Sequence, residues 1–107
     1  MPDIVFSPDA LSDLQRTKTY ITEELYSESA AANTIEKIIT RIRMLSAFPE
    51  SGVPLSSVVK FDTDYRFLVC GNYTVFYKYE NDTVYVVRVL YYRRDFMRIL
   101  FEPPTEQ

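Results

Sequence analysis

The residues best suited to chemistry lie together near the end of the chain, in the stretch VVRVLYYRRDF at positions 86–96. A guanidinium group can hold a phosphate or a carboxylate through paired hydrogen bonds, and a phenol can donate a proton or stack on a base. We expect Arg66 to join this cluster from a neighbouring strand. The candidate site residues within the stretch are Arg88, Tyr91, Tyr92, Arg93 and Arg94.

These six residues also have an ordinary structural interpretation, and the charge pattern alone leaves both open. Arginines at the end of a sheet can pair with acids such as Asp62 and Asp64 and contribute little. Arg88 lies within an apolar strand, where a guanidinium needs a carboxylate or carbonyl partner or an open face. Arg93 and Arg94 stand where a final helix is predicted to begin. Positive charge there opposes the helix dipole, which hints at a partner.

Charge is distributed unevenly along the chain. Between residues 86 and 98, four arginines against one aspartate give a net charge of +3, whereas the remaining 8 basic and 14 acidic residues give −6. The total of −3 argues against a protein that coats nucleic acid. Arginine and tyrosine gathered in one place are nevertheless the residues richest in binding hot spots.

Missing residue types exclude several classes of chemistry. The chain has no histidine and a single cysteine, Cys70, so the usual near-neutral acid–base group and a zinc site are both lacking. Its two glycines, Gly52 and Gly71, cannot supply a phosphate-cradling loop or a dinucleotide fingerprint. We therefore expect no cofactor and no metal, and we exclude hydrolase, kinase and dehydrogenase functions built on those groups.

Length and composition indicate one globular domain over residues 1–107. The 107 residues, 47% apolar and 25% charged, suffice for one modest core, and the proline-containing end predicts a flexible tail over about 102–107. No apolar run approaches the roughly 18–20 residues that cross a bilayer. The start lacks the basic region of a secretory signal, and one cysteine demands no oxidising compartment. The sequence predicts a cytoplasmic protein.

Two helices are predicted after a short strand at 3–6. Ser7 and Pro8 are typical of a helix start, and the second helix must stop near Phe48 because Pro49 follows. Both helices show apolar residues at spacings of three and four, which predicts two core stripes. These stripes are Leu11, Leu14, Ile21 and Leu25 in the first helix, and Ala32, Ile35, Ile38, Ile39, Ile42 and Leu45 in the second.

Three strands are predicted after a long connection, at 65–70, 73–80 and 83–90, and a short helix is predicted at about 93–101. Two-residue turns join the strands. The fold class is therefore α+β, with a helical hairpin packed on a mostly antiparallel sheet whose other face stays partly open. Strict alternation places Tyr73, Val75, Tyr77 and Tyr79 on one face of the second strand, and Val84, Val86, Arg88 and Leu90 on one face of the third.

The order of these elements, with the segment RFLVCGNYTVFYKYENDTVYVVRVLYYRRD at 66–95, resembles the RelE/ParE superfamily of bacterial type II toxin–antitoxin toxins. Members commonly read Arg-Val-Leu-His-x-x-Arg-Asp near the end, and this chain has Tyr91 at the histidine position. The resemblance covers nearly the whole chain. It implies a plasmid-stabilisation toxin that a cognate antitoxin holds inactive, as a toxin–antitoxin hetero-oligomer or a homodimer.

The superfamily divides by target, and the RelE-like branch cleaves mRNA on the ribosome. Cleavage through the 2′-hydroxyl needs a base, an acid and cations around the phosphate. Under this alternative Arg66 and Arg88 hold phosphate, and Tyr91 or Tyr92 donates a proton. The carboxylates considered as base are Glu50, Asp62 and Asp64. Leu68 and Thr74 stand where ribonuclease members tend to carry basic residues, which counts against this branch.

The ParE-like branch poisons DNA gyrase and needs less chemistry of its own, because the toxin traps an enzyme that cuts DNA itself. The helical hairpin and the segments VVRVL and RRD look more like this branch. We therefore predict a gyrase inhibitor that is not itself an enzyme. An mRNA endoribonuclease or a non-toxic antitoxin-binding module are the alternatives. The residues predicted to contact the target are Arg66, Arg88, Tyr91, Tyr92, Arg93 and Arg94.

Overall fold

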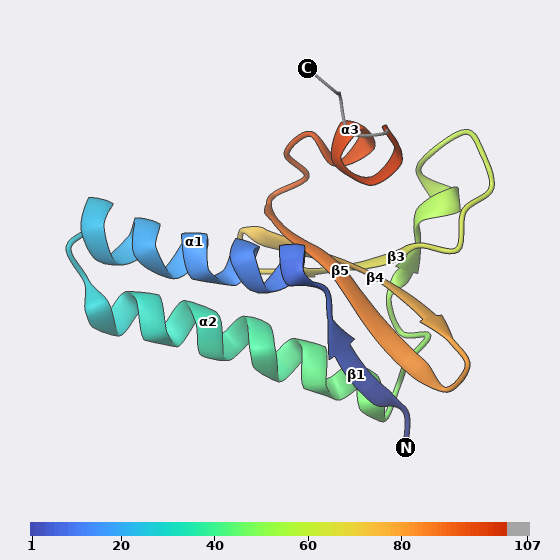
Figure 1. Ribbon diagram of the computed structural model, residues 1–107, viewed down its shortest axis with the longest axis horizontal. Helices are drawn as coiled ribbons and strands as arrows, with labels where there is room; N and C mark the ends of the chain where they lie inside the picture. Colours follow the sequence, from blue (N-terminus) through green and yellow to red (C-terminus); the bar gives the residue numbers. More distant parts are fainter. Residues whose placement is uncertain (103–107) are drawn as a thin grey trace.

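The computed structural model describes residues 1–102, and most of the tail predicted at about 102–107 lies outside them (Figure 1). The elements follow the predicted order of strand, two helices, strands and helix. They are β1 (Asp3–Phe6), α1 (Pro8–Glu24), α2 (Glu28–Arg43), η1 (Met44–Ser46), β2 (Val53–Pro54), η2 (Leu55–Ser57), β3 (Arg66–Cys70), β4 (Tyr73–Glu80), β5 (Thr83–Tyr91) and α3 (Phe96–Phe101). The predicted α+β class is confirmed.

The described strands form one five-stranded sheet in the order β1-β5-β4-β3-β2. Strand β1 runs parallel to β5 and the other neighbours are antiparallel, so the sheet is mostly antiparallel as predicted. The two-residue strand β2 was not predicted. It lies in the long connection, where Val53 pairs with Phe67 and Pro54 with Arg66. A proline is tolerated there because β2 is an edge strand.

Helices α1 and α2 form an antiparallel hairpin beside the sheet (Figure 1). Each begins with a serine cap: Ser7 Oγ accepts from the Ala10 N–H at 2.9 Å, and Ser27 Oγ accepts from the Ala30 N–H at 3.1 Å. Ser7 Oγ also donates to the Val87 carbonyl at 2.7 Å, which ties the start of α1 to β5.

The apolar stripes of the helices were predicted only in part. Most of the predicted residues are buried or half-buried, but Leu11 and Leu25 are 55% and 59% exposed, and Ala32 is exposed while Ala31 is fully buried. The buried face of α1 is rotated relative to the predicted stripe, and it was missed because it includes the polar residue Asp13, which an apolar pattern does not mark. That face consists of Ala10, Asp13, Leu14 and Ile21.

The predicted alternation holds along β4 and fails along β5. Phe76 pairs with Arg88 while its neighbour Tyr77 pairs with Val86, so Val87 is an extra residue, a β-bulge. Beyond the bulge, each side chain of β5 points to the face opposite to the one that strict alternation predicts. Val86 faces the helices, whereas Arg88 shares the opposite face with Phe76. The prediction that Val84, Val86, Arg88 and Leu90 share one face is therefore wrong.

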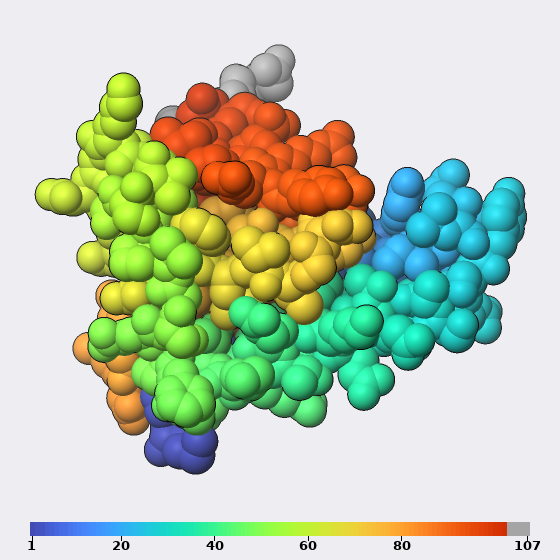
Figure 2. Space-filling view, turned by 180° about the vertical axis from the view of Figure 1, so that it is seen from behind, coloured from blue at the N-terminus to red at the C-terminus, as the bar shows by residue number. Residues whose placement is uncertain are grey.

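Helix α3 closes part of the face predicted to be open. Phe76 and Leu90 are buried beneath it, and the Phe76 and Phe96 rings stack with centroids 5.6 Å apart. Figure 2 shows the orange-red segment that contains α3 lying against the yellow part of the sheet. The helix starts at Phe96 and not at 93, because Tyr92 and Asp95 adopt positive φ angles of 53° and 50° that interrupt a right-handed helix. Arg93 and Arg94 therefore precede the helix.

Candidate functional site

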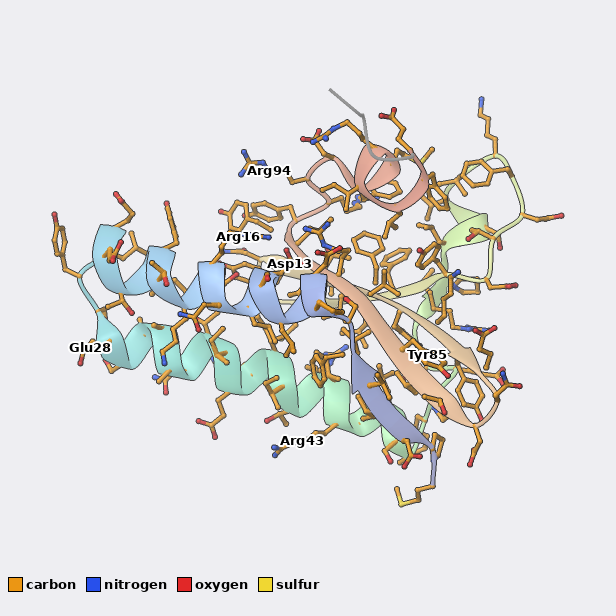
Figure 3. All side chains as sticks on the ribbon, in the orientation of Figure 1. Asp13, Arg16, Glu28, Arg43, Tyr85 and Arg94 are labelled. Atoms are coloured by element: carbon orange, nitrogen blue, oxygen red, sulfur yellow. The ribbon has the colours of Figure 1, made fainter. Side chains whose placement is uncertain are left out.

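A cleft of about 550 Å³ lies between α1, the end of β5 and the segment leading into α3. It exists because β1 stops at Phe6 and α1 follows directly, so the helix lies beside the edge of β5 that β1 leaves unpaired. Helix α1 contributes Asp13, Arg16 and Tyr20 to the lining. Figure 3 shows Arg94 on the side of the cleft opposite α1.

Asp13 is the organising residue of the cleft floor, since it is only 6% exposed and accepts four hydrogen bonds. Arg88 donates through Nε and Nη2, both at 2.8 Å, the Val89 N–H donates at 2.9 Å, and Arg16 Nη2 donates at 3.0 Å. Arg88 thus has the carboxylate partner that its place in an apolar strand required, and hydrogen bonding to Asp13 raises its pKa. One edge of its guanidinium is fully occupied.

Asp13 was missed by the sequence reasoning, although a signal for it exists. It falls between Ala10 and Thr17 at the helical spacing of the inward stripe. A carboxylate at such a position predicts a buried acid, which must then find a cation and backbone donors. The matching cation was Arg88, which the sequence places within an apolar strand.

Arg66 does not join the cluster, and that expectation is wrong. It pairs across the sheet with Tyr77, four residues along β4 from Tyr73, roughly 13 Å from the rung that holds Tyr91. Because Arg88 pairs instead with Phe76, the two strand arginines point to opposite faces.

The partners of Arg66 belong to the loop that precedes β2. Its Nη1 donates to the carbonyls of Glu50 at 3.1 Å and Gly52 at 2.9 Å, and Nη2 lies 3.8 Å from the Glu50 carboxylate. Asp62 and Asp64, the acids considered for the structural alternative, are not paired with it. Arg66 therefore holds the loop that precedes β2 against the sheet, at the end away from the cleft.

Three tyrosines form an aromatic cluster at the rim of the cleft. Tyr91 meets Tyr73 and Tyr92 edge-on, with ring centroids 5.5 Å and 4.5 Å apart. Tyr91 and Tyr92 are both exposed. A side-chain hydrogen bond with Tyr92 raises the pKa of Tyr91.

The remaining arginines near the cleft come from the segment that follows β5 and from α3. Arg94 lines the cleft, whereas Arg93 is exposed outside it, and no carboxylate within residues 1–102 lies within ion-pair distance of either. Arg98, which also lines the cleft, is 3.2 Å from Asp95. In all, four arginines and two aspartates line the cleft, a net charge of +2.

The carboxylates considered as general base lie apart from this cleft. Glu50 and Asp64 line a separate hollow of about 460 Å³ with Arg66. Leu68 and Thr74 are buried in the sheet and offer nothing to a phosphate. Within residues 1–102, no group of three or more metal-ligating side chains occurs, and no helix there has the length and apolar character to cross a membrane.

Comparison with known proteins identifies the family to which this fold belongs. The family model described as "ParE toxin of type II toxin-antitoxin system, parDE" matches residues 4–96. The chain belongs to this ParE toxin family, which confirms the ParE-like resemblance read from the sequence.

A solved structure titled "Chromosomal ParDE TA system from P. aeruginosa" is similar to the chain in fold. The TM-score is 0.69 at 15% sequence identity, and the alignment covers 83% of this chain and 94% of that one. At this identity the likeness establishes the fold alone. Among curated proteins no match is found.

Proposed function

We propose that this ParE-family toxin inhibits DNA gyrase and is neutralised by a cognate antitoxin. The observation that carries the proposal is the bidentate Arg88–Asp13 pair. Arg88 is the strand arginine best placed to hold a phosphate beside Tyr91, and its fork is bound by a carboxylate of the same chain. With the carboxylate bases at the far end of the sheet, the cleft is suited to binding and poorly suited to RNA cleavage.

A neutralising antitoxin is supported by the family and by surface that the fold leaves uncovered. Leu11 on α1 and Leu25 at its C-cap are 55% and 59% exposed. A partner that covered them would remove this apolar surface from water. Expression of the toxin with its antitoxin should restore growth, and the complex should survive gel filtration.

The target is tested by incubating the purified chain with gyrase and relaxed plasmid. We expect loss of supercoiling and accumulation of cleaved DNA, and we expect Arg94→Gln to weaken both effects because Arg94 lines the cleft without a carboxylate partner among the described residues. Arg43→Gln is the matched control, since Arg43 is exposed on α2 and points away from the cleft (Figure 3). Unchanged supercoiling, together with cut mRNA on translating ribosomes, would replace this proposal with the ribonuclease alternative.

A further inference from the structure

Three guanidinium groups of the cleft are accessible to an anion from solution. Arg94 has no carboxylate of residues 1–102 within 4.0 Å. The side chains of Arg16 and Arg98 are paired with Asp13 and Asp95 but remain 68% and 63% exposed. The Arg98–Asp95 pair is exposed on both sides and contributes little to stability. Asp13 is buried but keeps its hydrogen bonds from Arg88 and the Val89 N–H when Arg16 turns away, so both arginines can exchange a carboxylate for a ligand oxygen.

Aromatic rings face the same cleft from two elements. Tyr20 comes from α1 and Tyr91 from the end of β5, and the two rings are 56% and 47% exposed. Contacts with Tyr73 and Tyr92 hold the Tyr91 ring in place, so stacking a base on it orders little that is not already ordered. Tyrosine rings beside arginines are the combination that binds unpaired bases and their phosphates.

The cleft offers little to an apolar peptide. Of its aliphatic lining residues, Val89 and Leu90 are buried, which leaves only Ile99 partly exposed. An amphipathic helix binds by laying an apolar stripe into an apolar groove, and this cleft has no such surface. Its accessible side chains are mainly arginines and tyrosines, with the Asp95 carboxylate beside Arg98.

We propose that this cleft binds a single-stranded segment of DNA, with phosphates at Arg16, Arg94 and Arg98 and a base stacked on Tyr91. The overall charge of −3 does not prevent this, because charges more than about 8 Å away are largely screened at physiological salt. A volume of about 550 Å³ is in the ordinary range for a small-ligand site. The choice of DNA over RNA rests on the proposed action at gyrase, but the binding test contains no gyrase.

The phosphate contacts are tested with the full chain and a labelled oligothymidine, followed by fluorescence anisotropy over a salt series. Oligouridine RNA and a DNA duplex of the same length are the comparison arms. We expect the single-stranded DNA to bind most tightly. Arg94→Gln should lower the slope of log affinity against log salt by about 0.7, the value for one lost phosphate contact on a single strand. Arg43→Gln, the control on α2, should leave the slope unchanged.

The stacking contact is tested by Tyr91→Leu, which should weaken binding about fivefold or more. Tyr85→Leu is the control, since Tyr85 is an exposed tyrosine at the other end of the same strand (Figure 3). Circular dichroism establishes that each variant is folded.

Several results would overturn the inference: no binding of oligothymidine at low salt, equal effects of the Arg94 and Arg43 variants, or tighter binding of the RNA or the duplex. Gyrase inhibition by a chain that binds no oligothymidine would overturn this inference and leave the proposed function standing. Oligothymidine binding without gyrase inhibition would do the reverse.

Discussion

Asp13 joins α1 to β5, and its removal should be costly. In Asp13→Asn the charge that neutralises Arg88 is lost, and the Arg88 side chain is only 19% exposed. Breaking a buried ion pair from one side leaves an uncompensated charge, so we expect the free energy of unfolding to fall by about 3 kcal/mol. Urea denaturation measures this loss.

The control is Arg16→Gln, which removes a donor from the same carboxylate. Because the Arg16 side chain is 68% exposed, we expect this change to cost less than about 1 kcal/mol. Equal effects of the two substitutions would show that Asp13 does not owe its importance to Arg88 and Val89.

Tyr77 links stability to alkaline pH. Its buried hydroxyl accepts from the Gly52 N–H and donates to the Pro49 carbonyl, both at 2.9 Å, and burial raises its pKa. A phenol with a raised folded-state pKa contributes stability that is fully present below the unfolded pKa of about 10. That contribution is lost as pH rises through the folded-state value. Unfolding free energies measured at increasing pH should therefore fall in the alkaline range.

Tyr77→Phe separates this tyrosine from the other eight. The variant should start about 1–2 kcal/mol less stable at neutral pH, because the Gly52 N–H loses its acceptor, and it should then lose less stability at high pH. An alkaline fall as steep as that of the wild type would assign the effect to other groups.

At the scale of the element, the two leucines near the start of α1 have opposite roles. Leu14 packs in the core beneath the helix, whereas Leu11 is 55% exposed. We expect Leu14→Ala to cost about 3 kcal/mol and Leu11→Ala less than about 1 kcal/mol in urea denaturation. A large loss for Leu11→Ala would mean that the predicted stripe, and not the rotated one, faces the core.

The same elements show what a sequence can predict. Strand β1, the helical hairpin and the hairpin turns were predicted because caps, prolines and turn residues are local signals. The bulge at Val87 was not predicted, since VYVVRVL is apolar on both faces. Such a segment shows no alternation that would indicate which residues face the helices. The late start of α3 depends on positive φ angles at Tyr92 and Asp95, which nothing nearby in the sequence demands.

At the scale of the molecule, two hydrophobic clusters share one sheet. Tyr77 and Val86 belong to the cluster under the helical hairpin, while Phe76 and Leu90 belong to the cluster under α3. Because both clusters draw on β4 and β5, we expect residues 1–107 to unfold as one domain in a single transition. Far-UV circular dichroism and tyrosine fluorescence should give the same urea midpoint. A separate early transition would show that α3 unfolds independently.

Only the part of the candidate site whose residues are close together in the sequence was predicted. The run from Arg88 to Arg94 is local, and most of it does gather at the cleft. Arg16 and Tyr20 reach the cleft only because α1 lies beside the unpaired edge of β5, a contact made across about seventy residues of chain. Arg66 was misplaced for the same reason, since its face and position depend on strand register.

The bulge at Val87 gives Arg88 a second consequence, in the choice between alternative hairpins. A regular, unbulged pairing of β4 with β5 would carry Arg88 to the helix side, among the apolar residues Val75 and Ile38. In such a misaligned hairpin, docking of the helices would bury an unpaired cation, and the cost of desolvating it would favour separation of the two strands first. Arg88, which binds Asp13 in the native structure, would thereby disfavour the wrong strand register during folding.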